Sequence, residues 1–326
     1  MNDNHVFCSK NIFLVYCGLH AAGYDLCPRG LDPAIKTLIS SIKKNDLLTD
    51  YFKNTRLESC PVNPYWPRGF LLALASFYYT GSNNYSESEE QMLDCYLDSL
   101  DHISDEEKDE DTKQWLYKLP SILTEMSTIP ELSEAWTSYK RSLAEFEPSF
   151  ERQILDTMKL FTRKMKIPMQ ELPEFRFIPN YLQAPQITDP VFYDNTIYLL
   201  CHTPDRASII HELLHYSLAK YLDDNFKEIS RYAHLLKPVL PEMLRYRYAW
   251  DDGVASWANV FDEHIMRAAS LWLTYDSEKV QVIGNAYAKE GFRYVPGIIE
   301  CFQKEWKGME SFDIFLTTCL KHYMRI

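Results

Sequence analysis

The spacing of apolar residues along this chain is helical over most of its length. Residues 31–53 and 68–80 place apolar side chains three and four positions apart, as on one face of an α-helix. Residues 131–165 keep this spacing long enough for one or two long amphipathic helices. Glycine is scarce, with 10 residues in 326, so these stretches predict a helical N-terminal half.

The stretch 82–114 is strongly acidic but keeps a helical stripe of apolar residues. The stripe consists of Met92, Leu93, Tyr96, Leu97 and Leu100. The charge run DEEKDEDT that follows is interpreted as a solvated loop or the start of a helix.

The pattern changes near Pro168, where aromatic, β-branched and proline residues become frequent. This composition predicts short strands at about 175–179 and 190–201. Helical spacing resumes at about Asp205, a suitable N-cap residue, and continues to the end. The prediction is a mainly α fold with a small β-sheet, in which a helical region (1–165) packs on a second region (166–326).

Composition and charge exclude several classes of protein. The net charge is -12, which disfavours a nucleic-acid groove or an anionic membrane surface as partner. No apolar run reaches the roughly 20 residues of a membrane span. The apolar run at 12–27 is interpreted as a buried helix rather than a signal sequence. The eight cysteines form no CxxC pair, which favours free thiols and a cytoplasmic location.

Residues 207–222, ASIIHELLHYSLAKYL, carry two histidines four positions apart. Positions i and i+4 share one helix face, so His211 and His215 can direct two imidazoles at one zinc ion. Glu212 is suited to take a proton from a water that zinc activates. The surrounding residues are apolar, which predicts a buried helix whose polar groups need partners. This favours a metal site over the alternative, two histidines packed in a core.

A catalytic zinc ion takes three protein ligands and keeps a fourth position open. No histidine follows at the HExxHxxGxxH spacing, so the third ligand must come from elsewhere. The later candidates are Asp223, Asp224, Glu228, His234, Glu242, Asp251, Asp252, Glu263 and His264. Glu263 is favoured, because residues 253–275 predict a helix buried on both sides, where a carboxylate needs a strong partner. An ion pair with Arg267, one turn further on, is the alternative.

The other candidates have simpler interpretations. His264 is expected to face the apolar side of its helix. Asp251 and Asp252 are interpreted as the N-terminal cap of the helix at 253–275. Asp223 and Asp224 are expected to end the HELLH helix in a loop.

HELLH followed by Glu263 resembles the gluzincins, the glutamate-type HExxH zinc metallopeptidases that include thermolysin, over about residues 172–270. DEHIMRAA and the segment from KEGFRYVPG to TTCL resemble an uncharacterised bacterial family of presumed metallopeptidases, a domain of unknown function. That resemblance extends weakly to GLHAAGYD at 18–25. It implies a zincin-like α+β catalytic domain over 166–326, preceded by the helical region, with Zn²⁺ as cofactor.

The chain departs from thermolysin-like enzymes at one position. Those enzymes place an aspartate, which orients a ligand histidine, four residues after the ligand glutamate, where this chain has Arg267. We therefore expect Asp262 or a backbone carbonyl to orient a ligand histidine here.

A peptidase also needs a donor that stabilises the developing oxyanion. Tyr294 and Tyr287 are the candidates, and simple packing is the alternative because the chain has 22 tyrosines. The strand near DNTIYLLC is a candidate for binding an extended peptide through its backbone, although the sequence leaves open which edge is exposed.

The sequence therefore predicts a zinc-dependent metallopeptidase with Glu212 as general base, acting on a peptide or protein. The alternative is a non-catalytic helical interaction or scaffold protein with a structural or degenerate HELLH helix. A third possibility is a metal-dependent hydrolase of a non-peptide amide. Nucleotide enzymes and serine hydrolases are disfavoured, because the chain has no GxxxxGK[ST], GxGxxG or GxSxG sequence.

Overall fold

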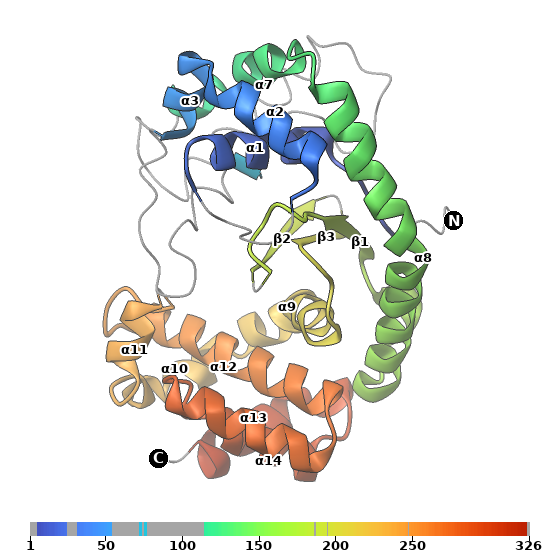
Figure 1. Cartoon of the computed structure of the whole chain (residues 1–326). Coiled ribbons are helices and arrows are strands. Elements are labelled where there is room, and N and C mark those ends of the chain that lie inside the picture. The colour runs from blue at the N-terminus through green and yellow to red at the C-terminus, as the bar shows by residue number, and fades with distance from the viewer. Residues whose placement is uncertain are drawn as a thin grey trace. The chain divides into compact units, whose positions relative to one another are not determined.

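The computed structural model describes residues 5–24, 31–53, 72–73, 75–76, 114–185, 187–193, 195–246 and 248–324. Most of these residues are helical, and three short strands form one sheet (Figure 1). The predicted fold class, mainly α with a small sheet, is confirmed.

The chain divides into two compact units. Unit 1 comprises Met1–Ser149, Arg176–Val191 and Tyr198–Thr203, and unit 2 comprises Phe150–Phe175, Phe192–Ile197 and Pro204–Ile326. The division falls inside one long helix, α8 (Leu132–Met165), after Ser149 and next to Pro148. The predicted boundary after residue 165 therefore lies within unit 2. The amphipathic pattern of α8 continues past Pro148, so the sequence gives no sign of this division.

Unit 1 is built around a helix that is buried on almost every side, α1 (Lys10–Ala21). Ser9 caps it by accepting a hydrogen bond from the Ile12 backbone N–H. The buried helix predicted at 12–27 is confirmed as far as Ala21, where α1 ends. Among the described residues, no helix combines the length and the apolar character that crossing a membrane would require.

Three further helices and the first part of α8 surround α1 in unit 1: α2 (Pro33–Lys43), α3 (Asp46–Lys53) and α7 (Leu119–Ser127). Gly18 of α1 lies directly against the Phe52 ring, where a Cβ atom would come within 2.1 Å of a ring carbon. The helical predictions at 31–53 and 131–165 are confirmed. The predicted helix at 68–80 is described only at 72–73 and 75–76, which are helical, and the stripe at 92–100 lies outside the described residues.

The sheet contains β1 (Glu174–Pro179), β2 (Thr188–Tyr193) and β3 (Thr196–Cys201), in the order β1-β3-β2. The single strand predicted at 190–201 is wrong. The chain turns between β2 and β3, where Asn195 has φ +58°, a backbone conformation that asparagine tolerates better than most residues.

The turn also changes which strand is available to a peptide. β3, with the sequence TIYLLC, is buried at all six positions and pairs with a strand on each side. The segment proposed to bind a peptide is therefore central and offers no free edge along TIYLLC. The outer edge of β1 carries a bridge between Phe177 and Val6. Among the described residues, no further strand pairs with the outer edge of β2.

Unit 2 is a helical assembly around α12 (Val254–Thr274), against which α9 (Arg206–Asp224), α10 (Phe226–Ser230), α13 (Ser277–Lys289) and α14 (Val295–Glu305) pack (Figure 1). The remaining helices are α11 (Leu240–Arg245), α15 (Phe312–Thr318) and the short turns η1 (Met169–Glu171), η2 (Ala233–Leu236), η3 (Met309–Ser311) and η4 (Cys319–Tyr323). Trp257 is fully buried on α12 and donates its indole N–H to the Ile229 carbonyl. Lys164 of α8 donates to the carbonyls of Trp272 and Leu273, near the C-terminal end of α12.

The helix that carries HELLH begins as predicted. Asp205 is the N-cap of α9, and its carboxylate accepts hydrogen bonds from the backbone N–H and the hydroxyl of Ser208. At the other end, Asp223 and Asp224 lie in the last turn of α9, and α10 begins almost at once after Asn225, so no extended loop follows.

We expect Asp205→Ala to lower the free energy of unfolding by about 1 kcal/mol, because two donors at the start of α9 lose their acceptor. Denaturation midpoints in urea would measure the change. Asp224→Ala is the matched control. It removes an exposed carboxylate at the opposite helix end, where a negative charge is unfavourable, so stability should stay the same or rise. Equal losses in both variants would contradict this account.

Candidate metal centre

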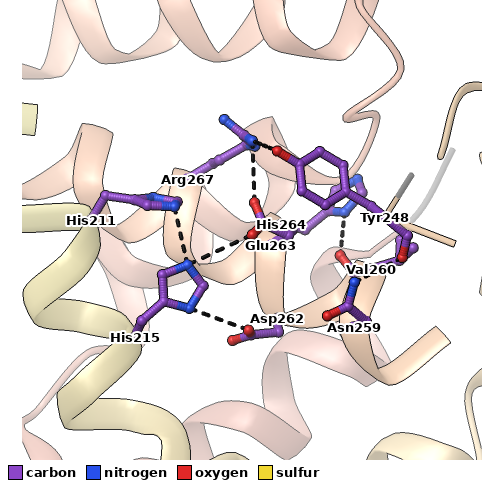
Figure 2. A network of polar contacts seen from close by, with 9 residues as sticks. All are labelled: His211, His215, Tyr248, Asn259, Val260, Asp262, Glu263, His264 and Arg267. Carbon is purple, nitrogen blue, oxygen red and sulfur yellow. Dashed lines mark hydrogen bonds and ion pairs between the residues drawn. The ribbon is translucent and has the colours of Figure 1, made fainter. Parts of the chain in front are cut away.

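The centre of unit 2 brings the two HELLH histidines to the carboxylate of Glu263. α12 packs along α9, and the Ser270 hydroxyl of α12 donates to the Ala207 carbonyl in the first turn of α9. His211, His215 and Glu263 then each offer one ligand atom, and these atoms lie within 4.8 Å of one another (Figure 2). Among the described residues, this is the one group of three or more potential ligands that meets in this way.

The distances within this group suit a tetrahedral ion. The Nε2 atoms of His211 and His215 are 3.1 Å apart, and His215 Nε2 lies 3.7 Å from Glu263 Oε1. Two ligands of a tetrahedral zinc ion, each about 2.0–2.1 Å from the metal, are about 3.3 Å apart. The imidazole rings stand at 80° to one another, so both Nε2 atoms can point to a common centre. These residues therefore fit a zinc ion with two histidine ligands and one glutamate ligand.

His215 has a carboxylate partner on its other ring nitrogen. Its Nδ1 lies 3.4 Å from Asp262 Oδ2, one residue before Glu263 (Figure 2). A metal-binding histidine usually donates its second N–H to such a group, which fixes the tautomer and the ring orientation. Asp262, one of the two expected partners, therefore lies where it can orient the His215 ring. It directly precedes the candidate ligand Glu263 in the sequence.

The charges around the histidines separate their pKa values. Burial lowers the pKa of His211 well below its usual value, and the charges of His215 and Arg267 lower it further. Burial acts in the same direction on His215, but Asp262, Glu263 and Glu212 outweigh it and raise its pKa to about 9. The raised pKa favours a proton on His215, which makes His215 the donor in the 3.1 Å contact with His211 Nε2. A metal ion at the same point would take the place of this proton.

Glu263 has a second partner on the side away from the histidines. Its Oε2 lies 3.2 Å from Arg267 Nη2, so the predicted alternative, an i,i+4 ion pair, is also present. Burial raises the pKa of Glu263, and the charges of Arg267 and His215 oppose that rise. The two oxygens thus divide their contacts, since Oε1 faces His215 and Oε2 faces Arg267.

The carboxylate of Glu212 is buried, with 6% of the residue exposed. It follows His211 directly on α9, and its charge contributes to raising the pKa of His215, so it lies within electrostatic range of the centre. A buried carboxylate beside a metal site is suited to proton transfer.

The two tyrosines expected to stabilise an oxyanion have different contacts. The hydroxyl of Tyr294 donates to the Leu235 carbonyl, and its ring packs on His264 and Trp257, so it is a packing residue. Tyr287 lies beside Arg267, whose guanidinium carbon is 5.6 Å from the ring centroid. Tyr287 thus contacts Arg267, which in turn pairs with Glu263.

His264 is the histidine that packs in the core. It is fully buried between Phe292 and Tyr294, and its Nδ1 is hydrogen-bonded to the Val260 carbonyl at 2.7 Å. Burial lowers its pKa to about 4, so it is neutral. The expectation that His264 faces the apolar side is consistent with this environment.

The remaining candidates are held by other contacts. Glu228 pairs with Arg231, and Glu242 lies 3.7 Å from Arg293. Asp251 and Asp252 are not the N-cap of α12, which is Gly253. Asp251 still orders this helix start, because it accepts hydrogen bonds from the Gly253 N–H and the Ser256 hydroxyl. His234 lies in η2 beside the Tyr232 ring.

The sequence interpretation missed the residues that hold Arg267. The Tyr248 hydroxyl accepts a hydrogen bond from Arg267 Nη2 at 2.6 Å, and the Phe292 ring lies 4.3 Å from the guanidinium carbon. Asn259 of α12 fixes Tyr248 in turn by donating to its carbonyl. Tyr248 and Phe292 lie between helices, and no spacing in the sequence relates them to Arg267.

Comparison of the chain with models of protein families, with curated proteins and with solved structures finds no match.

We expect Asp262→Asn to weaken zinc binding by about 10–100-fold, because an amide is a poorer acceptor for the Nδ1–H of His215. Competition with a zinc-sensitive chelator would measure the affinity. Asp252→Asn is the matched control, since Asp252 is exposed in the loop before α12. Unchanged affinity in Asp262→Asn, or an equal loss in the control, would contradict the orienting role.

Proposed function

We propose that this chain is a zinc-dependent metallopeptidase, with His211, His215 and Glu263 as zinc ligands and Glu212 as general base. The observation that carries the proposal is the convergence of one ligand atom from each of these three residues within 4.8 Å. His2Glu with an open fourth position is the ligand set of thermolysin-type catalytic zinc sites.

The residues of the chain suit the hydrolysis of an amide. Bound zinc supplies a Lewis acid that lowers the pKa of water and polarises a carbonyl group. Glu212 accepts a proton from the attacking water and passes it to the nitrogen of the leaving amine. Asp262 holds the His215 ring through Nδ1, so that Nε2 keeps its direction toward the centre.

The choice of a peptide or protein as substrate rests on the resemblance of HELLH and Glu263 to the gluzincins. A non-peptide amide would require the same chemistry, so the substrate class is decided by assay. The free thiols of Cys8, Cys17, Cys201, Cys301 and Cys319 support a reducing compartment, and we place the protein in the cytoplasm.

A non-catalytic helical interaction or scaffold protein is the second candidate, and one observation favours it. The charged groups have ion-pair partners within the protein, because His215 lies between Asp262, Glu263 and His211, and Arg267 pairs with Glu263. The HELLH helix can then be a structural element alone. Metal content separates this candidate from the first.

Metal analysis of protein purified without added zinc should give about one zinc ion per chain. We expect Glu212→Gln to keep this zinc and to lower the turnover of a peptide library by at least about 100-fold, because the general base is lost. Glu278→Gln on the exposed first turn of α13 is the control, and it should keep both zinc and turnover.

The outcomes separate the candidates. Absence of bound zinc, also after incubation with zinc, would refute the metallopeptidase. Bound zinc without turnover across broad peptide libraries would favour the scaffold. Full turnover in Glu212→Gln would exclude Glu212 as the base. Turnover of simple amides but of no peptide would favour the non-peptide hydrolase.

A further inference from the structure

The carboxylate of Glu263 is held from two sides at once. Oε1 lies 3.7 Å from His215 Nε2, on the side where the ligand atoms converge. Oε2 lies 3.2 Å from Arg267 Nη2, on the opposite side (Figure 2). A carboxylate can bind a metal through one oxygen or through both. Here one oxygen already has a cationic partner within the protein.

Arg267 has little freedom to move away from Glu263. Nη2 donates a hydrogen bond to the Tyr248 hydroxyl at 2.6 Å and forms an ion pair, without a hydrogen bond, with Glu263 Oε2. The guanidinium carbon lies 4.3 Å from the centroid of the Phe292 ring, 5.4 Å from that of Tyr248 and 5.6 Å from that of Tyr287. A guanidinium against aromatic rings gains cation–π attraction, which increases when the pair is shielded from water. The side chain is only 19% exposed.

The number of oxygens that Glu263 contributes decides whether the site is open. Two histidines and one carboxylate oxygen fill three positions of a tetrahedral ion and leave the fourth for a reactant. Two histidines and both carboxylate oxygens fill all four. Catalysis at the centre therefore requires that Oε2 stays away from the metal.

We propose that Arg267 is a positioning residue that holds Oε2 of Glu263, restricts this ligand to one oxygen and so keeps the fourth coordination position open. The inference rests on the metal site of the proposed function and adds how that site stays available. It also gives a role to the departure from the thermolysin-like pattern. Here the carboxylate that orients a histidine belongs to Asp262, the residue before Glu263. Arg267, four residues after Glu263, orients the glutamate itself.

Among the described residues, no cation other than Arg267 forms an ion pair with Oε2 of Glu263. Asp262 faces the opposite ring nitrogen of His215, and His211 meets His215 on the side of the convergence point. The ion pairs of Glu263 are those with His215 and Arg267. Removing the guanidinium therefore frees Oε2 without removing a ligand.

The test replaces zinc by Co²⁺, because tetrahedral cobalt absorbs visible light more strongly than cobalt with five or six ligands. Wild-type protein should give an intense spectrum, and acetohydroxamate should change it by binding at the open position. In Arg267→Met, which keeps an apolar stem against Phe292, we expect a smaller acetohydroxamate-induced change of the spectrum and about tenfold weaker acetohydroxamate binding, because both carboxylate oxygens then occupy the ion. Arg267→Lys keeps the charge and should restore most of both values.

Arg231→Met is the matched control, since it also breaks an ion pair between an arginine and a glutamate, Glu228, in unit 2. It should leave the cobalt spectrum and its response to acetohydroxamate unchanged. Circular dichroism establishes that each variant folds. If Arg267→Met does not fold, Tyr248→Phe takes its place, because it removes the hydroxyl that fixes Nη2, and the response to acetohydroxamate should fall in the same way.

A wild-type spectral response to acetohydroxamate in Arg267→Met, with wild-type acetohydroxamate binding, would overturn the inference and leave the metal site in place. The same change in Arg231→Met would also overturn it, since the effect would then reflect general loss of stability. Wild-type protein that binds neither cobalt nor zinc would refute the proposed function, and this inference with it.

Discussion

The packing of α12 along α9 places the carboxylate of Glu263 and the imidazoles of His211 and His215 together at a partly buried site, where their charges need partners. Isolated charges away from water are unfavourable by several kcal/mol. The chain meets this constraint with a connected set, in which Arg267 faces Glu263 and Asp262 faces His215.

The balance of charge in this set favours a cation. Three carboxylates, those of Glu212, Asp262 and Glu263, raise the pKa of His215 against the effect of its burial. Arg267 is the permanent cation of the set, and the remaining positive charge is a proton on His215. A proton held where two Nε2 atoms and a carboxylate oxygen converge is a site that a divalent ion can take.

Two neighbouring residues of α12, Glu263 and His264, have different roles. His264 has a backbone carbonyl on Nδ1 and aromatic rings around it, which is how a histidine is accommodated in a core. Glu263, the residue before it, points toward the histidines of α9. Adjacent residues of a helix are 100° apart around its axis, and this rotation separates a packing role from a ligand role.

The spacing of apolar residues by itself determined the mainly helical fold, the N-cap at Asp205 and the pairing of His211 with His215 on one face of α9. These features are local, because they depend on the 3.6-residue period and on capping within one turn. The same local argument favoured Glu263, which follows from a helix predicted to be buried on two sides. Asp262, with a backbone carbonyl as the alternative, was expected only from the departure from the thermolysin-like pattern at Arg267.

The tertiary structure decided the features that depend on contacts between residues distant in the sequence. The turn at Asn195 divides the predicted strand and makes β3 central, because pairing on both sides depends on segments distant in sequence. The division of the chain after Ser149 lies inside a continuous helix, since packing rather than helix propensity sets it. Tyr248 reaches Arg267 from one segment, and Tyr287 and Phe292 reach it from the C-terminal end of α13 and the residues just after it, so only the packing of the helices brings the three rings together around Arg267.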